Sequence, residues 1–490
     1  MDTSPIHRLG HDLLLEIFEY NADMFVDPTA LDTSLKATQV CLSWRALMLE
    51  TPWIWGRLID IDYICRIHAS DQWFDELVAR AGSAMLWIKM LEGLGRNIAA
   101  DKVDRFLFGL LEKSWSRVQR LCVAVDASTL DPYSSPRWRW LYLPAPYLEI
   151  LDIEFGNDFP IPDSSLPLLF SGQAPALQQF KAQFWPFDTH VPWTSGLLSL
   201  FVGAPLTLPQ LMAVLQKSSG LKMLNIGDIA DPVTLPVHLP LIPLRKMQCL
   251  GIIGNMSFIT CAHILEHIDT LADCSLMYYP VGMNRSTRTF SDDDFARVVR
   301  ALATFARRFF SISQPEQISL YSRRNDITFM DNRTVALSGY TIMLPCNYEN
   351  FQLPISSQTA GTFFTTFSLP EFSTVTALRI RFPPHVPLSA LATFFACLPA
   401  VEELTTDDVG IACILGAQNS MTTPEGSPLV IFPKLKTIHL AEDESPALGP
   451  TSVASSESVH AFVAARREAG KSVEVCKFVG EEHRWGRNII

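Results

Sequence analysis

Residues 5–58 read PIHRLGHDLLLEIFEYNADMFVDPTALDTSLKATQVCLSWRALMLETPWIWGRL. Within 12–20, four apolar residues recur at helical spacing, which predicts a short amphipathic helix. Asp27-Pro28 indicates a turn, and Pro28 suits the start of a short helix that runs to Leu31. The apolar positions of 35–50 predict one further helix, which Thr51-Pro52 ends. A segment of this size cannot bury all of its apolar groups alone, so we expect the rest of the chain or a partner to cover them.

Bulk composition limits the classes of function. The chain has 490 residues, 48% of them hydrophobic, with a formal net charge of −12. This length and composition predict a large globular core, and the acidic balance disfavours nucleic acid and anionic membranes as partners. No uninterrupted apolar run reaches the length of a membrane-spanning helix, and the first ten residues, MDTSPIHRLG, do not resemble a secretory signal.

The ten cysteines form no Cys-x-x-Cys pair, and most lie within apolar runs. Reduced, buried thiols in a cytoplasmic or nuclear protein are the simplest interpretation.

Behind the first segment, a helix–strand–helix order is expected over residues 70–115: helices in DQWFDELVARAG and DKVDRFLFGLLEKSW, and a strand in LWIKML. From about residue 117 a pattern apolar-x-x-apolar-x-apolar recurs every 20 to 34 residues. Its clearest copies begin at Val118, Leu148, Leu177, Leu197, Leu221, Val375, Val401 and Leu435. Such units bury their apolar faces only by stacking, which favours an irregular leucine-rich-repeat-like α/β solenoid, although the polar Asn of the standard repeat is mostly missing.

The regular spacing is interrupted over residues 283–372. SDDDFARVVRALATFARRFF predicts a strong helix with acidic residues in its first turn. The following DITFMDNRTVALSGYTIMLP alternates with period 2, which indicates strands and a hairpin. We interpret this region as an insertion in the array. Residues 442–458, rich in Ser, Pro and Ala, predict a mobile loop, and the chain ends in one more helix-to-strand unit.

Residues 5–58 resemble an F-box, more narrowly the F-box-like motif of large fungal families. The similarity rests on the apolar helix around Leu13 and Ile17, on Val40-Cys41-x-x-Trp44-Arg45, and on Pro52-x-x-Trp55. It covers about residues 4–60. The family usually has Leu-Pro before the first helix, and Leu9-Gly10 stands here. The array behind it is similar to the leucine-rich-repeat-like domains of many such proteins.

The resemblance implies a substrate-recognition subunit of an SCF-type cullin-RING ubiquitin ligase. Its three-helix F-box would bind a Skp-type adaptor, its array would bind an unknown target protein, and it would have no catalytic residue. The alternative is a repeat-based interaction scaffold that acts outside the ligase. We expect Pro5, Ile6, Leu14 and Trp55 to contact the adaptor, and Leu13, Ile17, Val40 and Trp44 to share adaptor contact with internal packing. The full expected adaptor set is Pro5, Ile6, Leu9, Leu13, Leu14, Ile17, Phe18, Val40, Cys41, Trp44, Pro52 and Trp55.

The expected organisation is therefore an F-box-like domain, a helical connector or first repeat, a repeat array, an insertion, and C-terminal repeats with an end cap. Their ranges are 1–60, 61–116, 117–282, 283–372 and 373–490.

Two other clusters are weaker candidates. Cys261, His263, His267 and Cys274 suggest metal ligands, but the surrounding residues fit a plain amphipathic helix better, and we expect neither a metal nor a cofactor. Arg137-Trp138-Arg139-Trp140 combines cations and aromatic rings, as nucleic-acid surfaces do, yet a repeat rim fits it better in an acidic protein.

Overall fold

The computed structural model describes residues 9–67, 70–91, 100–125, 136–155, 168–182, 185, 187–203, 206–229, 238–254, 256–279, 291–323, 326–331, 339–345, 356–382, 386–421, 430–441 and 457–478. The chain is a mixed α/β protein in which most strands run parallel, and it divides into two compact units, residues 1–221 and 222–490. The predicted mobile loop falls almost entirely outside the described residues.

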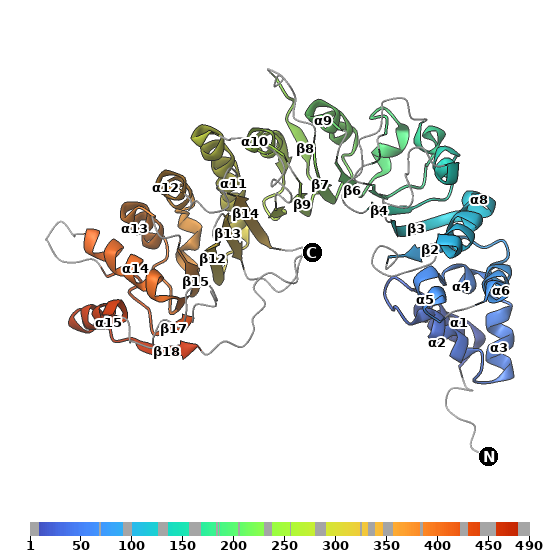
Figure 1. The fold of residues 1–490 in the computed structure, drawn as a ribbon, viewed down its shortest axis with the longest axis horizontal. Helices are drawn as coiled ribbons and strands as arrows, with labels where there is room; N and C mark the ends of the chain where they lie inside the picture. Colours follow the sequence, from blue (N-terminus) through green and yellow to red (C-terminus); the bar gives the residue numbers. More distant parts are fainter. Residues whose placement is uncertain are drawn as a thin grey trace, which may run out of the picture. The chain divides into compact units, whose positions relative to one another are not determined.

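The first unit begins with short helices and continues as strands that pair in chain order, each parallel to the next. Figure 1 labels these elements in blue to green. The helices are α1 (His11–Asn21), α2 (Ala30–Ala37), α3 (Leu42–Leu49), α4 (Pro52–Gly56), α5 (Ile61–Arg66), α6 (Asp71–Ala81), α7 (Ala100–Val103), α8 (Gly109–Ser114) and α9 (Leu208–Lys217). The strands are β1 (Ile59–Asp60), β2 (Leu86–Met90), β3 (Val118–Val125), β4 (Ile150–Phe155), β5 (Gln179–Lys181) and β6 (Ser199–Val202).

The prediction of a single helix over residues 35–50 is wrong. The structure forms α2 and α3 with a break at residues 38–41, where Cys41 is fully extended (φ −158°, ψ 167°) and its sulfur accepts the backbone N–H of Trp44. The Thr38 hydroxyl donates to the Leu35 carbonyl at 2.7 Å, which closes the preceding turn. Side-chain bonds of this kind compete with helix continuation, so apolar periodicity alone does not reveal the break.

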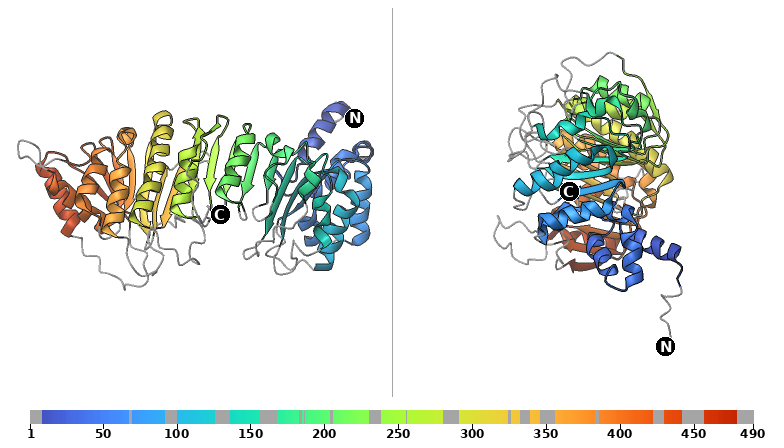
Figure 2. Two further views of the ribbon diagram at one scale, coloured as in Figure 1. Left: turned by 90° about the horizontal axis from the view of Figure 1, so that it is seen from above. Right: turned by 90° about the vertical axis from the view of Figure 1, so that its right-hand side faces the viewer.

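In the second unit, helices α10 to α15 lie along the same side of the strands (Figures 1 and 2). The helices are α10 (Phe258–His267), α11 (Asp292–Ile312), α12 (Ser357–Thr366), α13 (Leu388–Ala396), α14 (Asp408–Ser420) and α15 (Glu457–Glu468). The strands are β7 (Met223–Ile226), β8 (Ile242–Leu244), β9 (Cys249–Ile252), β10 (Ile268–Thr270), β11 (Ser275–Tyr278), β12 (Gln317–Arg323), β13 (Asp326–Asp331), β14 (Tyr340–Pro345), β15 (Ala377–Arg381), β16 (Glu403–Thr406), β17 (Thr437–Ala441) and β18 (Glu474–Phe478).

The hairpin expected within residues 283–372 is present, and it lies in the sheet. Strand order in this unit is β7-β9-β11-β14-β13-β12-β15-β16-β17-β18, and only β13 runs antiparallel to its neighbours among these pairs. The β13–β14 hairpin thus separates β11 from β12. The pattern beginning at residue 118 marks strands as predicted, because its apolar positions, such as Leu121, Leu151 and Leu404, are buried.

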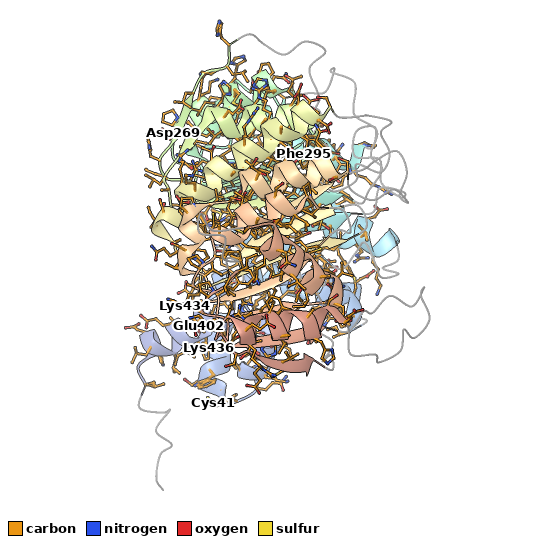
Figure 3. All side chains as sticks on the ribbon, turned by 90° about the vertical axis from the view of Figure 1, so that its left-hand side faces the viewer. Cys41, Asp269, Phe295, Glu402, Lys434 and Lys436 are labelled. Carbon is orange, nitrogen blue, oxygen red and sulfur yellow. The ribbon has the colours of Figure 1, made fainter. Side chains whose placement is uncertain are left out.

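Neighbouring strands share one type of backbone contact where they begin. In the first unit, the N–H of Glu149 donates to the Gln119 carbonyl, and the N–H of Gln178 donates to the Glu149 carbonyl, at 2.8 and 2.9 Å. In the second unit, the N–H of Lys436 donates to the Glu402 carbonyl at 2.8 Å, and their side chains pair at 2.6 Å (Figure 3). Main-chain hydrogen bonds therefore join neighbouring strands at this position in both units.

Candidate docking surface on the N-terminal helices

Helix α1 divides its apolar residues between a buried and an exposed side. Leu14 and Phe18 are buried, and the Phe18 ring meets Trp44 of α3 edge-on at 5.0 Å between centroids. Leu13, Ile17 and Tyr20, at positions i, i+4 and i+7, are 51%, 43% and 81% exposed. That spacing places the three side chains in one stripe along the helix.

Helix α3 and the break before it add more exposed apolar groups. Val40, Leu42 and Leu49 are all exposed, whereas Met48 is buried and Trp44 and Leu47 are half-buried. We call the six exposed side chains on these helices the N-terminal apolar surface: Leu13, Ile17, Tyr20, Val40, Leu42 and Leu49. Isolated exposed apolar residues are ordinary, but these six and Val26 make seven exposed large apolar side chains within 37 residues, a concentration that indicates an interaction site.

Several residues expected to contact an adaptor lie elsewhere. Leu14, Phe18 and Trp55 belong to the core, and Trp55 is 0% exposed, with its Nε1–H donating to the Met48 carbonyl at 2.8 Å. Leu14 and Trp55, which we expected to contact an adaptor, are therefore covered by the chain itself, and amphipathic spacing does not reveal which of two adjacent apolar residues turns inward. Pro5 and Ile6 lie outside the described residues.

The remaining expected residues have mixed positions. Leu9, Cys41 and Trp44 are half-buried and Pro52 is exposed, while Leu13, Ile17 and Val40 belong to the N-terminal apolar surface. Sequence reasoning missed Tyr20 and Leu42. Tyr20 was detectable, since it lies three residues after Ile17 on the same helical stripe.

Charged groups around the helices mostly engage local partners. Lys36 pairs with Asp32 one turn earlier at 2.6 Å, and this hydrogen bond raises the pKa of Lys36. Thr29 donates two hydrogen bonds to Asp27, which lower the pKa of that carboxyl group. Both hydrogen-bonded arrangements favour the charged form of the side chain, in the turn and helix between α1 and α3.

The N-terminal helices are fixed to the first strands of their unit. Lys89 on β2 donates to the Met24 carbonyl at 3.0 Å and lies 3.2 Å from the Asp60 carboxylate. The Phe25 ring lies 6.1 Å from the ring of Trp87, also on β2. The turn after α1 therefore packs on a strand, which positions the N-terminal apolar surface rigidly with respect to β2.

The structure does not bring together the other two candidate clusters in the way that the sequence suggested. Trp138 and Trp140 are buried, and Arg137 and Arg139 pair with Asp104 and Glu112, so this sequence presents no aromatic nucleic-acid surface. Cys261 and Cys274 are buried, and burial raises the pKa of each thiol to about 12, which disfavours the thiolate that a metal requires. In the part of the chain that the structure describes, the group with metal-ligand geometry is instead His263, Glu266 and His267.

No protein-family model matches this chain, and no curated protein matches it either. Among the described helices, none is both long and apolar enough to cross a membrane.

Proposed function

We propose that this protein is a substrate-recognition subunit of an SCF-type ubiquitin ligase, whose N-terminal helices bind a Skp-type adaptor. The observation that carries the proposal is the N-terminal apolar surface. Its side chains are exposed in the isolated chain, on helices whose residues resemble an F-box. Burying them against a partner gains about 25 cal/mol per Å² of apolar area, so a few such residues account for specific binding.

The rigid attachment of these helices supports the same role. A receptor of this kind holds its target at a fixed place relative to the ligase, and the contacts of Lys89 and Trp87 with the turn after α1 provide that fixed connection within the first unit.

The strands provide the surface on which we propose the target binds, in an irregular leucine-rich-repeat-like solenoid. Across β15, β16 and β17, Arg379, Thr405 and His439 stand in register and are half-buried. They alternate with Leu378, Leu404 and Ile438, which are buried. Curved repeat arrays bind their partners on such strand faces.

The test is binding of the full-length chain to a purified Skp-type adaptor. Deleting residues 1–60 is unsuitable, because it removes Ile54 and Trp55 from the core. Charged substitutions on the exposed stripe of α1 are suitable, since they leave the buried side of the helix intact. A folded chain that never binds the adaptor would instead favour an interaction scaffold that acts outside the ligase.

A further inference from the structure

Three potential ligand groups gather on the outer side of α10. His263 and His267 lie one helical turn apart with ring centroids 5.8 Å from each other. One potential ligand atom from each of His263, Glu266 and His267 lies within 4.8 Å of the other two. The inner side of the helix, with Cys261, Ile264 and Leu265, is buried, so α10 itself holds the three groups at the surface. Figure 3 labels Asp269 of β10, two residues after the end of α10, and Phe295 of α11.

The ring of His267 is oriented as a metal ligand would be. Its Nδ1 lies 2.9 Å from the carbonyl oxygen of His263. A carbonyl only accepts, so Nδ1 carries the proton and Nε2 keeps its lone pair. Metal-binding histidines commonly use this same bond from the second nitrogen to fix their tautomer and orientation.

Arg297 of α11 contacts the other two groups. Its guanidinium donates to both Glu266 oxygens, at 3.0 and 2.6 Å, and lies 3.4 Å from Nδ1 of His263. Because a guanidinium only donates, Nδ1 of His263 is the accepting nitrogen of a neutral ring. If Arg297 turns away from Glu266 and His263, the site offers two imidazole nitrogens and one carboxylate, a donor set that suits Zn²⁺.

We propose that His263, Glu266 and His267 bind a divalent transition-metal ion such as Zn²⁺, and that Arg297 competes with the ion for Glu266. Zinc bonds of about 2.0–2.1 Å place tetrahedral ligand atoms about 3.4 Å apart, so modest side-chain rotations suffice. The Arg297 and Glu266 side chains are about one-third exposed, and exposed ion pairs are weak, so a metal ion can displace the guanidinium.

The order His-x-x-Glu-His also occurs in inverted zincins, where the Glu is a catalytic base. Here Glu266 is engaged by Arg297, so the proposal concerns metal binding and not hydrolysis. It is independent of the proposed function, because its test involves no adaptor.

The experiment is isothermal titration of Zn²⁺ into the full-length chain, stripped with EDTA and dialysed, at pH 7.5 without phosphate. We expect one equivalent of Zn²⁺ to bind. His267→Ala should weaken Zn²⁺ binding at least tenfold, and the double variant His263→Ala with His267→Ala should abolish it. Arg297→Gln should tighten binding severalfold, a gain that loss of structure would not produce. His460→Ala, which removes an exposed histidine on α15, should leave the affinity for Zn²⁺ unchanged.

Co²⁺ gives a second readout, since tetrahedral ligation produces visible absorption bands that the double variant should lose. Thermal unfolding followed by circular dichroism checks that each variant is folded. The proposal is overturned if the folded double variant binds Zn²⁺ as the parent does, which would assign the ion to other groups. It is equally overturned if Arg297→Gln binds Zn²⁺ no more tightly than the parent.

Discussion

The guanidinium carbon of Arg57 lies 4.6 Å from the centroid of the Trp87 ring. Arg57 follows α4 and Trp87 is on β2, so this contact joins the helical segment to the strands behind it. Arg120 of β3 approaches the same ring at 4.0 Å, and Arg57 also pairs with Glu19 of α1 at 2.9 Å. One indole therefore connects α1, α4, β2 and β3 through charged neighbours.

Removing the charge of Arg57 should loosen this connection. Arg57→Met keeps an unbranched apolar stem but loses the cation–π contact and the half-exposed ion pair, together about 1–2 kcal/mol. The measurement is the first transition in urea unfolding of the full chain. Arg45→Met, on the exposed side of α3, is the matched control and should stay within about 0.5 kcal/mol of the parent. Equal stability of the two variants would refute the role given to Arg57.

Substitutions of Trp55, the tryptophan of Pro52-x-x-Trp55, test whether this side chain belongs to the core. Trp55→Ala should lower the free energy of unfolding by about 3–5 kcal/mol, as expected for a buried aromatic side chain. Trp55→Phe loses the hydrogen bond to the Met48 carbonyl and should cost about 1–2 kcal/mol. Trp53→Phe, a half-buried neighbour, should cost less. A stable Trp55→Ala variant would show that the side chain is exposed after all.

Gly10 stands where the F-box-like motifs that this segment resembles usually carry proline. Its φ of −65° and ψ of 158° are angles that proline adopts, and an added Cβ would meet nothing within 4 Å. Gly10→Pro should therefore raise the free energy of unfolding by about 0.4–1 kcal/mol, by restricting the unfolded chain. The check is the unfolding midpoint in urea.

The contrasting glycine is Gly254, where a Cβ would come within 2.4 Å of the Gly227 backbone. Gly254→Ala should lower the unfolding midpoint. If Gly10→Pro lowers it as well, the conformation described for the start of α1 is incorrect.

Cysteine reactivity should follow burial. The pKa values of the Cys122, Cys261 and Cys274 thiols are raised from 9.0 to about 12, mainly by burial, so at pH 8 their thiolate populations fall about a thousandfold. Iodoacetamide at pH 8 should leave these three unmodified in the folded chain and label them after denaturation, as peptide mass spectrometry would show. Labelling of Cys261 in the folded chain at the rate of a free thiol would contradict its position.

The sequence predicted where strands form better than it predicted which strands lie next to each other in the sheet. Val118, Leu121 and Val123 follow the apolar-x-x-apolar-x-apolar pattern and are buried on β3, so that local pattern suffices to predict a strand. The place of the β13–β14 hairpin in the sheet depends on pairing with β11 and β12, which no local pattern contains. Strand formation is thus readable locally, whereas strand order depends on tertiary contacts.

The candidate docking surface was only partly predictable for a related reason. Leu13 and Leu14 are adjacent and equally apolar, yet Leu14 is buried and Leu13 is half exposed. Helical periodicity gives the spacing of a stripe but not which stripe the rest of the chain covers. The packing of Phe18 on Trp44 decides that, and it becomes visible only in the structure.

The central claim is that the exposed stripe of α1 binds a Skp-type adaptor, and titration calorimetry of the full chain against that adaptor tests it most directly. Ile17→Glu should weaken binding at least about thirtyfold, corresponding to about 2 kcal/mol, because it places a charge in an apolar contact. Ile312→Glu makes the same change at a more exposed position at the end of α11, and this variant should bind like the parent. Unchanged affinity of a folded Ile17→Glu variant, or absence of binding by the parent chain itself, would contradict the account.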